Sequence, residues 1–153
     1  YTFTKDNDKV VVLPYAIIDG KVKIMTLIEP IKLWGRAKEI TCVTGTLEEG
    51  EEPNDCAIRE LEEEVGIQSD WGSNWTYVGK FHPVKGSVDC RHMYLVNITG
   101  EPIKENPDED GSYFEKVAKR LLTKVEVEQV SNDMALCFLI EKLKNKFEGT
   151  SLI

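Results

Sequence analysis

The sequence has little of what marks a secreted, membrane-bound or nucleic-acid-binding protein. Its four cysteines form no C-x-x-C pair and no histidine completes a zinc-ligand spacing with them, which favours free buried thiols in a reducing compartment. No apolar run approaches the roughly 20 residues of a membrane span, and the polar stretch 1–9 holds no signal-peptide core. We therefore expect a cytoplasmic protein without membrane contact.

Positive charge is also scarce. Lys and Arg number 19 against 27 Asp and Glu, which gives a formal net charge of -8 and opposes binding to nucleic acid. With 41% hydrophobic residues and only six prolines, the 153 residues suit one globular domain over 1–153. A polyanionic ligand would need local cations to hold it.

Turn signals and apolar patterning predict several strands and few helices. Asp19-Gly20 between apolar segments predicts a hairpin over 10–18 and 21–28, followed by an irregular connection over 29–37. Further strands are expected over 39–44, 75–82, 92–99 and 113–122. Helices are expected over 53–65, from Thr123 with Glu126 as a capping box, and from Asn132 or Asp133.

The helix predicted over 53–65 carries a high density of acids. Pro53 suits its first turn, and Gly66 suits its C-terminal end. At about 100° per residue, Glu60, Glu63 and Glu64 share one face. An apolar stripe on another face would pack on the core, so we expect the acids to point away from it.

Carboxylates this close raise one another's pKa values and need a counter-charge. A divalent cation supplies it, and oxygen ligands without a histidine or cysteine cluster favour Mg²⁺, with Mn²⁺ as a substitute. Mg²⁺ commonly joins protein carboxylates to substrate phosphates and offsets charge that develops at phosphorus. The helix thus indicates metal-assisted hydrolysis at phosphorus, whereas the acids alone would also suit a solvated surface.

The residues around these acids distinguish the two interpretations. Every fixed position of the pattern G-x5-E-x7-R-E-U-x-E-E-x-G-U, where U is aliphatic, is matched from Gly45 to Ile67. The sequence therefore resembles the Nudix hydrolases, in which this pattern is called the Nudix box. The resemblance implies an α/β fold, namely an α/β/α sandwich with a mixed β-sheet and a loop-helix-loop catalytic motif. It also implies hydrolysis of a nucleoside diphosphate linked to another moiety.

The resemblance further implies roles for individual box residues. Arg59 would orient Glu51 and Glu63 by charge-assisted hydrogen bonds. Glu62 stands at a variable position, and we expect it to face solvent. The metal ligands implied are three helix carboxylates and one backbone carbonyl, those of Glu60, Glu64, Glu63 and Gly45.

Signals for the substrate lie outside the box. Pro83 stands 16 positions after Ile67, a spacing typical of ADP-ribose pyrophosphatases. Dinucleoside polyphosphate hydrolases tend to have a tyrosine about two residues later, where this chain has Lys85, and the segment 81–96 also resembles the ADP-sugar type. We therefore expect cleavage of ADP-ribose or a related nucleotide sugar to AMP and a sugar phosphate.

The general base and the residues that contact substrate stay open between alternatives. Glu109 in an acidic loop, one of its neighbours, or Glu60 could serve as the base. Each remaining candidate for substrate binding could instead be a residue that packs in the core or a charge on the surface. These candidates are Trp34 and Phe81, which could stack on a base, and Arg36, Lys85 and Arg91, which could meet phosphate.

Other activities fit the box as well. The alternatives are hydrolysis of dinucleoside polyphosphates, NADH or oxidised nucleoside triphosphates, and a non-catalytic nucleotide-binding module, against which the intact box argues. If the chain forms a homodimer, we expect it not to use a long N-terminal swapped region, because about nine residues precede the first predicted strand.

Overall fold

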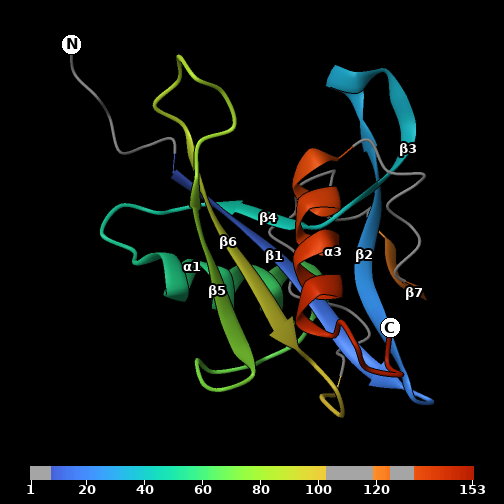
Figure 1. Ribbon diagram of the computed structural model, residues 1–153. Coiled ribbons are helices and arrows are strands. Elements are labelled where there is room, and N and C mark those ends of the chain that lie inside the picture. Colours follow the sequence, from blue (N-terminus) through green and yellow to red (C-terminus); the bar gives the residue numbers. More distant parts are fainter. Residues whose placement is uncertain (1–7, 103–118, 125–132) are drawn as a thin grey trace.

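The computed structural model describes residues 8–102, 119–124 and 133–153, and predictions that concern other positions lie outside the described residues. A seven-stranded sheet runs through the molecule in the order β3-β2-β1-β6-β5, with β4 also paired to β1 and β7 to β2 (Figure 1). β1 and β6 are parallel and the other pairs are antiparallel. The strands are β1 (Asp8–Ile18), β2 (Lys21–Ile31), β3 (Arg36–Thr41), β4 (Val43–Thr46), β5 (Trp75–Phe81), β6 (Cys90–Asn97) and β7 (Lys119–Lys124).

The predicted hairpin joins β1 to β2. Asp19 and Gly20 have φ values of 52° and 73°, a turn whose twist matches that of the strands it connects. β1 has a different antiparallel partner along each half, because residues 9–12 pair with β4 and residues 15–18 pair with β2. The first half of β1 thereby fixes the strand that enters the Nudix box.

Helices cover both faces of the sheet (Figure 1). α1 (Pro53–Glu60), extended by the turn η3 (Leu61–Val65), packs on one face, and α3 (Met134–Lys146) packs on the other. Alternate residues of β1 serve the two layers, with Val10 facing α1 and Val11 facing α3. This is the predicted α/β/α sandwich with a mixed sheet. It also explains why β1 is apolar almost throughout.

The chain between β2 and the box differs from the prediction. Residues 29–31 extend β2, and the 3-10 turn η2 (Lys32–Trp34) leads directly into β3, where an irregular connection was expected. The single strand predicted over 39–44 is divided at Cys42. Leu27 pairs with Thr41 in β3, whereas Val12 pairs with Val43 in β4, so the chain changes partner at this point.

The end of the chain follows the sequence signals in part. Thr123, the predicted N-cap, lies in β7 opposite Ile24, and Lys124 after it is still in this strand, so the helix does not begin at Lys124 as a capping box at Thr123 would require; residues 125–132 lie outside the described residues. Asp133 does cap α3, because its carboxylate accepts hydrogen bonds from the backbone N–H groups of Ala135 and Leu136 at 3.0 and 3.3 Å. Within the described residues, no helix is both long enough and apolar enough to cross a membrane.

Candidate active site

The box helix has the predicted ends but changes character along its length. Pro53 is its first residue, and Gly66 closes it with a φ of 80°. Beyond Glu60 the helix widens into the π-helical turn η3, which carries Glu63 and Glu64. A π turn holds more residues than an α turn, so a rotation of 100° per residue does not place these two acids. Such turns occur often at functional sites.

Glu60 does not point away from the core as predicted. Only 8% of its surface is exposed, and its side chain lies against the backbone of Gly45 in β4. A Cβ atom at position 45 would overlap Cγ and Cδ of Glu60. Pairing with Val10 of β1 holds this backbone in place. Glycine at position 45 is therefore what gives the Glu60 carboxylate its place between helix and sheet.

The Arg59 guanidinium holds three carboxylates together. Nε and Nη2 donate to the two carboxylate oxygens of Glu51 at 2.9 and 3.0 Å, a bidentate pair. Nη1 donates to Oε1 of Glu60 at 2.9 Å and to Oε2 of Glu63 at 3.1 Å. The contacts predicted with Glu51 and Glu63 are present, and the contact with Glu60 is an addition. Nη2 also reaches the carbonyl oxygen of Thr46 at 3.3 Å, which fastens the cluster to β4.

The electrostatics of the cluster are uneven. Hydrogen bonds from Arg59 lower the pKa of Glu51. Burial raises the pKa of Glu60 to about 7, because repulsion from Glu63 adds to the desolvation and Arg59 only partly opposes it. A raised pKa means that the negative charge of the buried carboxylate is not fully balanced by nearby positive charge. The other potential ligand atoms around it are carboxylate oxygens. The cluster therefore fits a hard divalent cation.

Backbone groups complete the arrangement in a way that the sequence pattern does not reveal. Glu64, on η3, accepts a hydrogen bond from the backbone N–H of Thr44 at 3.3 Å. Thr44 and Thr46 flank Gly45 in β4, so this short strand contacts Arg59, Glu60 and Glu64. Thr44 and Thr46 make these contacts through backbone atoms, which almost any residue type could supply at these positions. Sequence periodicity therefore gave no signal for these two threonines.

The predicted substrate residues are not all brought to the box. Phe81 packs edge-on against Phe138 of α3, with ring centroids 4.8 Å apart, and Arg91 lies directly opposite Phe81 in the sheet. Both therefore belong to the face that α3 covers, whereas the box helix covers the other face, so stacking on a base by Phe81 and phosphate binding by Arg91 at the box are not supported. Side chains alternate between the two faces of a sheet along each strand, and this alternation places Phe81 and Arg91 on the face opposite the box helix.

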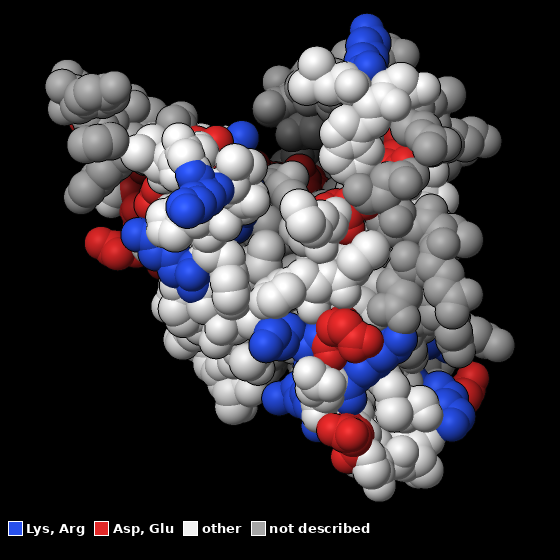
Figure 2. Space-filling view, turned by 45° about the horizontal axis from the view of Figure 1, so that its top comes forward, with Lys and Arg blue, Asp and Glu red and all other residues white. Residues whose placement is uncertain are grey.

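The other substrate candidates lie elsewhere. Trp34 is 46% exposed on η2, and Lys85 is exposed in the loop between β5 and β6. The backbone of Arg36 begins β3, but its side chain lies outside the description, as does Glu109 altogether. The end of the molecule with the β5–β6 loop and the β2–β3 connection is hollowed, with acidic side chains visible in the hollow (Figure 2).

The family comparison agrees with this geometry. A model of the NUDIX domain matches residues 16–135, which include the whole box and most of the sheet. The chain belongs to the NUDIX domain family. Membership implies a hydrolase that acts on phosphoric anhydrides, and enzymes of this family generally use a divalent metal ion such as Mg²⁺.

Solved structures of two hydrolases share the fold at low sequence identity. An ADP compounds hydrolase is 17% identical, with a TM-score of 0.63 over 90% of this chain and 74% of that one. An Ap4A hydrolase from C. elegans, in a binary complex, is 15% identical, with a TM-score of 0.63 over 93% of this chain and 98% of that one. A search of curated proteins gave no match.

Proposed function

We propose that the chain is a Mg²⁺-dependent pyrophosphohydrolase that cleaves the diphosphate of ADP-ribose or a related nucleotide sugar to AMP and a sugar phosphate. The observation that carries the hydrolase assignment is the buried Glu60 carboxylate, which lies against Gly45 and shares one guanidinium with Glu51 and Glu63. This arrangement concentrates carboxylates that need a cation. A merely solvated acidic surface would not bury one of them.

Three carboxylates and one backbone carbonyl would hold Mg²⁺, those of Glu60, Glu63, Glu64 and Gly45. When bound, the ion neutralises diphosphate charge and lowers the pKa of water. Arg59 holds Glu51, Glu60 and Glu63 through four hydrogen bonds, so two of the proposed ligands, Glu60 and Glu63, are positioned before the ion binds. In the reaction water attacks one phosphorus, the bridging P–O bond breaks, and the water proton passes to a carboxylate base.

The preference for ADP-ribose rests on Pro83, whose position after Ile67 is typical of ADP-ribose pyrophosphatases. Hydrolysis of dinucleoside polyphosphates is the second candidate. The C. elegans Ap4A hydrolase aligns over 98% of its length with the same TM-score as the ADP compounds hydrolase, so the fold favours neither substrate. Lys85, where a tyrosine is typical of the dinucleoside type, supports the first candidate.

A panel of substrates with Mg²⁺ tests the proposal. ADP-ribose, diadenosine polyphosphates, NADH, GDP-mannose and oxidised nucleoside triphosphates would be compared by kcat/KM, with product analysis by chromatography. We expect ADP-ribose to give the highest value, with AMP and ribose 5-phosphate as products. Turnover of another member without ADP-ribose would refute the substrate assignment. No turnover of any member would instead count against the hydrolase assignment.

The general base can be identified separately. Glu109 and Glu60 are the first candidates, followed by the acidic neighbours of Glu109 in its loop, and each of the two would be replaced by glutamine. Loss of the base should lower kcat strongly and be partly reversed at higher pH, where hydroxide concentration rises. Loss of a residue that only holds the cation should instead be relieved by more Mg²⁺. If neither variant shows pH rescue, the base lies elsewhere.

A further inference from the structure

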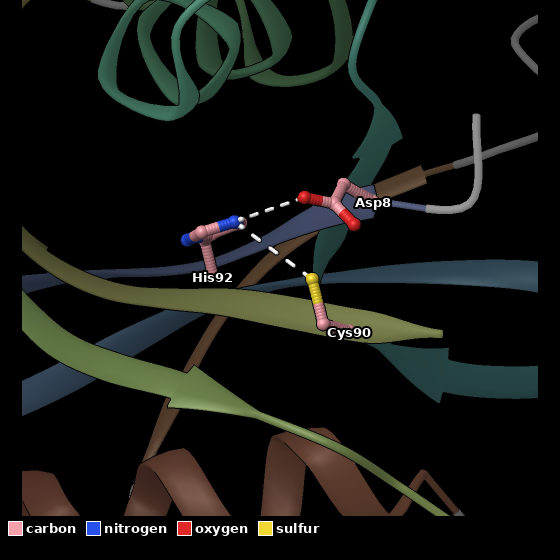
Figure 3. Close-up of side chains that lie close together, drawn as sticks. All are labelled: Asp8, Cys90 and His92. Atoms are coloured by element: carbon pink, nitrogen blue, oxygen red, sulfur yellow. Dashed lines mark hydrogen bonds and ion pairs between the residues drawn. The ribbon is translucent and has the colours of Figure 1, made fainter. Parts of the chain in front are cut away.

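A group of potential metal ligands that includes a thiol and an imidazole lies outside the carboxylates of the box. Asp8 begins β1, while Cys90 and His92 stand near the start of β6, and the three side chains point toward one another (Figure 3). Their ligand atoms all lie within 4.8 Å of one another, and theirs is the one such group among the described residues. Cys90 and His92 are 1% and 8% exposed. The cluster is thus mostly shielded from water.

Strand geometry explains why the sequence did not reveal this group. Residues two apart on a strand point to the same face, so Cys90 and His92 meet without any standard zinc spacing. Parallel pairing of β1 with β6 sets Asp8 opposite Cys90. Spacing along the sequence alone therefore did not single out Cys90 and His92 as a pair of candidate ligands. The third member comes from a strand more than 80 positions away in sequence.

The three groups converge on one point and do not form a relay. In a nucleophilic cysteine site, the two ring nitrogens of histidine face the thiol and the carboxylate separately. Here a single nitrogen, Nε2 of His92, faces both Sγ of Cys90 at 3.9 Å and Oδ2 of Asp8 at 3.5 Å. The geometry is that of ligands around a shared centre.

The separations approach those of a tetrahedral zinc site. With Zn–S near 2.3 Å and Zn–N and Zn–O near 2.1 Å, tetrahedral angles put sulfur and nitrogen about 3.6 Å apart and nitrogen and oxygen about 3.4 Å apart. The observed distances of 3.9 and 3.5 Å differ by a few tenths of an ångström. Sγ of Cys90 and the Asp8 carboxylate oxygen lie within 4.8 Å of each other and would close toward about 3.6 Å when an ion binds.

The other nitrogen of His92 has the partner that a metal-bound histidine needs. Nδ1 lies 3.0 Å from the Tyr77 hydroxyl, and the two rings stack at 6.2 Å. A hydrogen bond from Nδ1–H to this hydroxyl leaves the lone pair of Nε2 directed at Cys90 and Asp8. Such second contacts commonly fix the tautomer and orientation of a histidine ligand.

We propose that Asp8, Cys90 and His92 form a second metal site, distinct from the box, that binds a borderline-soft divalent ion such as Zn²⁺ through one oxygen, one sulfur and one nitrogen. The thiolate and the imidazole select against Mg²⁺, which the box carboxylates prefer. Three protein ligands leave a fourth position for water or another ligand. The site adjoins the box loop, because the backbone N–H of Leu47 donates to the carbonyl oxygen of Asp8 at 3.1 Å.

Cobalt spectroscopy tests the proposal directly. Co²⁺ would be titrated into the full chain carrying Glu64→Gln, which weakens competing binding at the box. We expect one equivalent to give thiolate-to-cobalt charge transfer in the near ultraviolet and the intense visible bands of a tetrahedral site. Cys90→Ser should abolish the charge transfer. Cys42→Ser is the matched control, because Cys42 is equally buried but its thiol neighbours Asp133 and is not part of this cluster.

A second variant keeps the test decisive if Cys90→Ser does not fold. Tyr77 is 47% exposed, so Tyr77→Phe should fold normally. It should lower Zn²⁺ affinity about 10-fold to 100-fold, measured against a chromophoric chelator, while the cobalt spectrum keeps its shape. An absent charge-transfer band, or a band lost equally in Cys42→Ser, would overturn the proposal. Unchanged zinc affinity in Tyr77→Phe would overturn the role of Tyr77 as the partner that orients His92 for the metal.

Discussion

Replacing Glu60 by glutamine should make the protein more stable at neutral pH when no divalent ion is present. Glutamine keeps the shape of the side chain and an oxygen that can accept from Arg59, but it carries no charge. The substitution therefore removes the cost of burying an ionised carboxylate and little else. This is the opposite of what a mutation in a buried polar cluster commonly does.

The size of the effect follows from the pKa of Glu60, which burial raises from 4.5 to about 7. One pKa unit corresponds to about 1.36 kcal/mol, so the ionised carboxylate costs at most about 3 kcal/mol of folding free energy above pH 7. Because the folded protein holds this proton more tightly than the unfolded chain, stability falls as pH rises from 4.5 to 7 and then stays level. The stability of Glu60→Gln should not show this decrease between pH 4.5 and 7.

Thermal and urea unfolding in the presence of EDTA would measure the difference at pH 4.5, 6 and 8. Wild type and Glu60→Gln should be similar near pH 4.5 and differ most at pH 8. For a chain of this length, about 1 kcal/mol corresponds to roughly 2–4 °C in Tm, so the variant should melt up to about 10 °C higher at pH 8. Glu49→Gln, at an exposed residue of the box loop, is the matched control and should show no such divergence.

The result that refutes this reasoning is a stability difference that does not change with pH. A constant difference would mean that Glu60 is ionised at no unusual cost and that its burial beside Gly45 is compensated by Arg59 alone. Addition of Mg²⁺ provides a second check. It should raise the Tm of wild type at pH 8 more than that of Glu60→Gln, because only wild type has the full ligand set.

Three further substitutions test other parts of the structure. Glu64→Gln should lower kcat by several orders of magnitude and leave the circular dichroism spectrum unchanged; a near-normal rate would contradict its assignment as a metal ligand. Gly45→Ala should displace the Glu60 side chain and lower kcat at least about 100-fold, whereas Gly50→Ala, in open space, should retain activity and lose only stability. Asp133→Ala should destabilise the protein by about 1–2 kcal/mol in urea unfolding, because it removes the cap of α3, and an unchanged midpoint would contradict that role.

Elements with local signals were predicted well from the sequence. The turn at Asp19-Gly20 and the ends of the box helix at Pro53 and Gly66 depend on backbone preferences of single residues, which act wherever the chain places them. Asp133 is a further case, since its side chain caps the helix that follows it directly. The bidentate pair between Arg59 and Glu51 spans only the first two turns of α1, and the resemblance to the box was enough to anticipate it.

Features that depend on distant segments were not predicted. Nothing near Cys42 in sequence shows that the chain changes strand partner there, because that depends on the positions of β1 and β2. The burial of Glu60 requires a bare backbone in β4, and a helical wheel does not contain that strand. The cluster of Asp8 with Cys90 and His92 likewise exists only because β1 and β6 run parallel.

The charge of the box explains why an acidic chain can bind a diphosphate. Four box carboxylates, those of Glu51, Glu60, Glu63 and Glu64, carry four negative charges when ionised. The one arginine of the box, Arg59, contacts the first three and offsets a single charge, so these four carboxylates together would repel phosphate. One divalent ion would leave the cluster negative, whereas two would make it positive. Because the net charge of the whole chain is -8, attraction for the substrate has to arise locally from cations at these carboxylates. Burial of Glu60 strengthens that requirement, since low polarity around it magnifies every uncompensated charge.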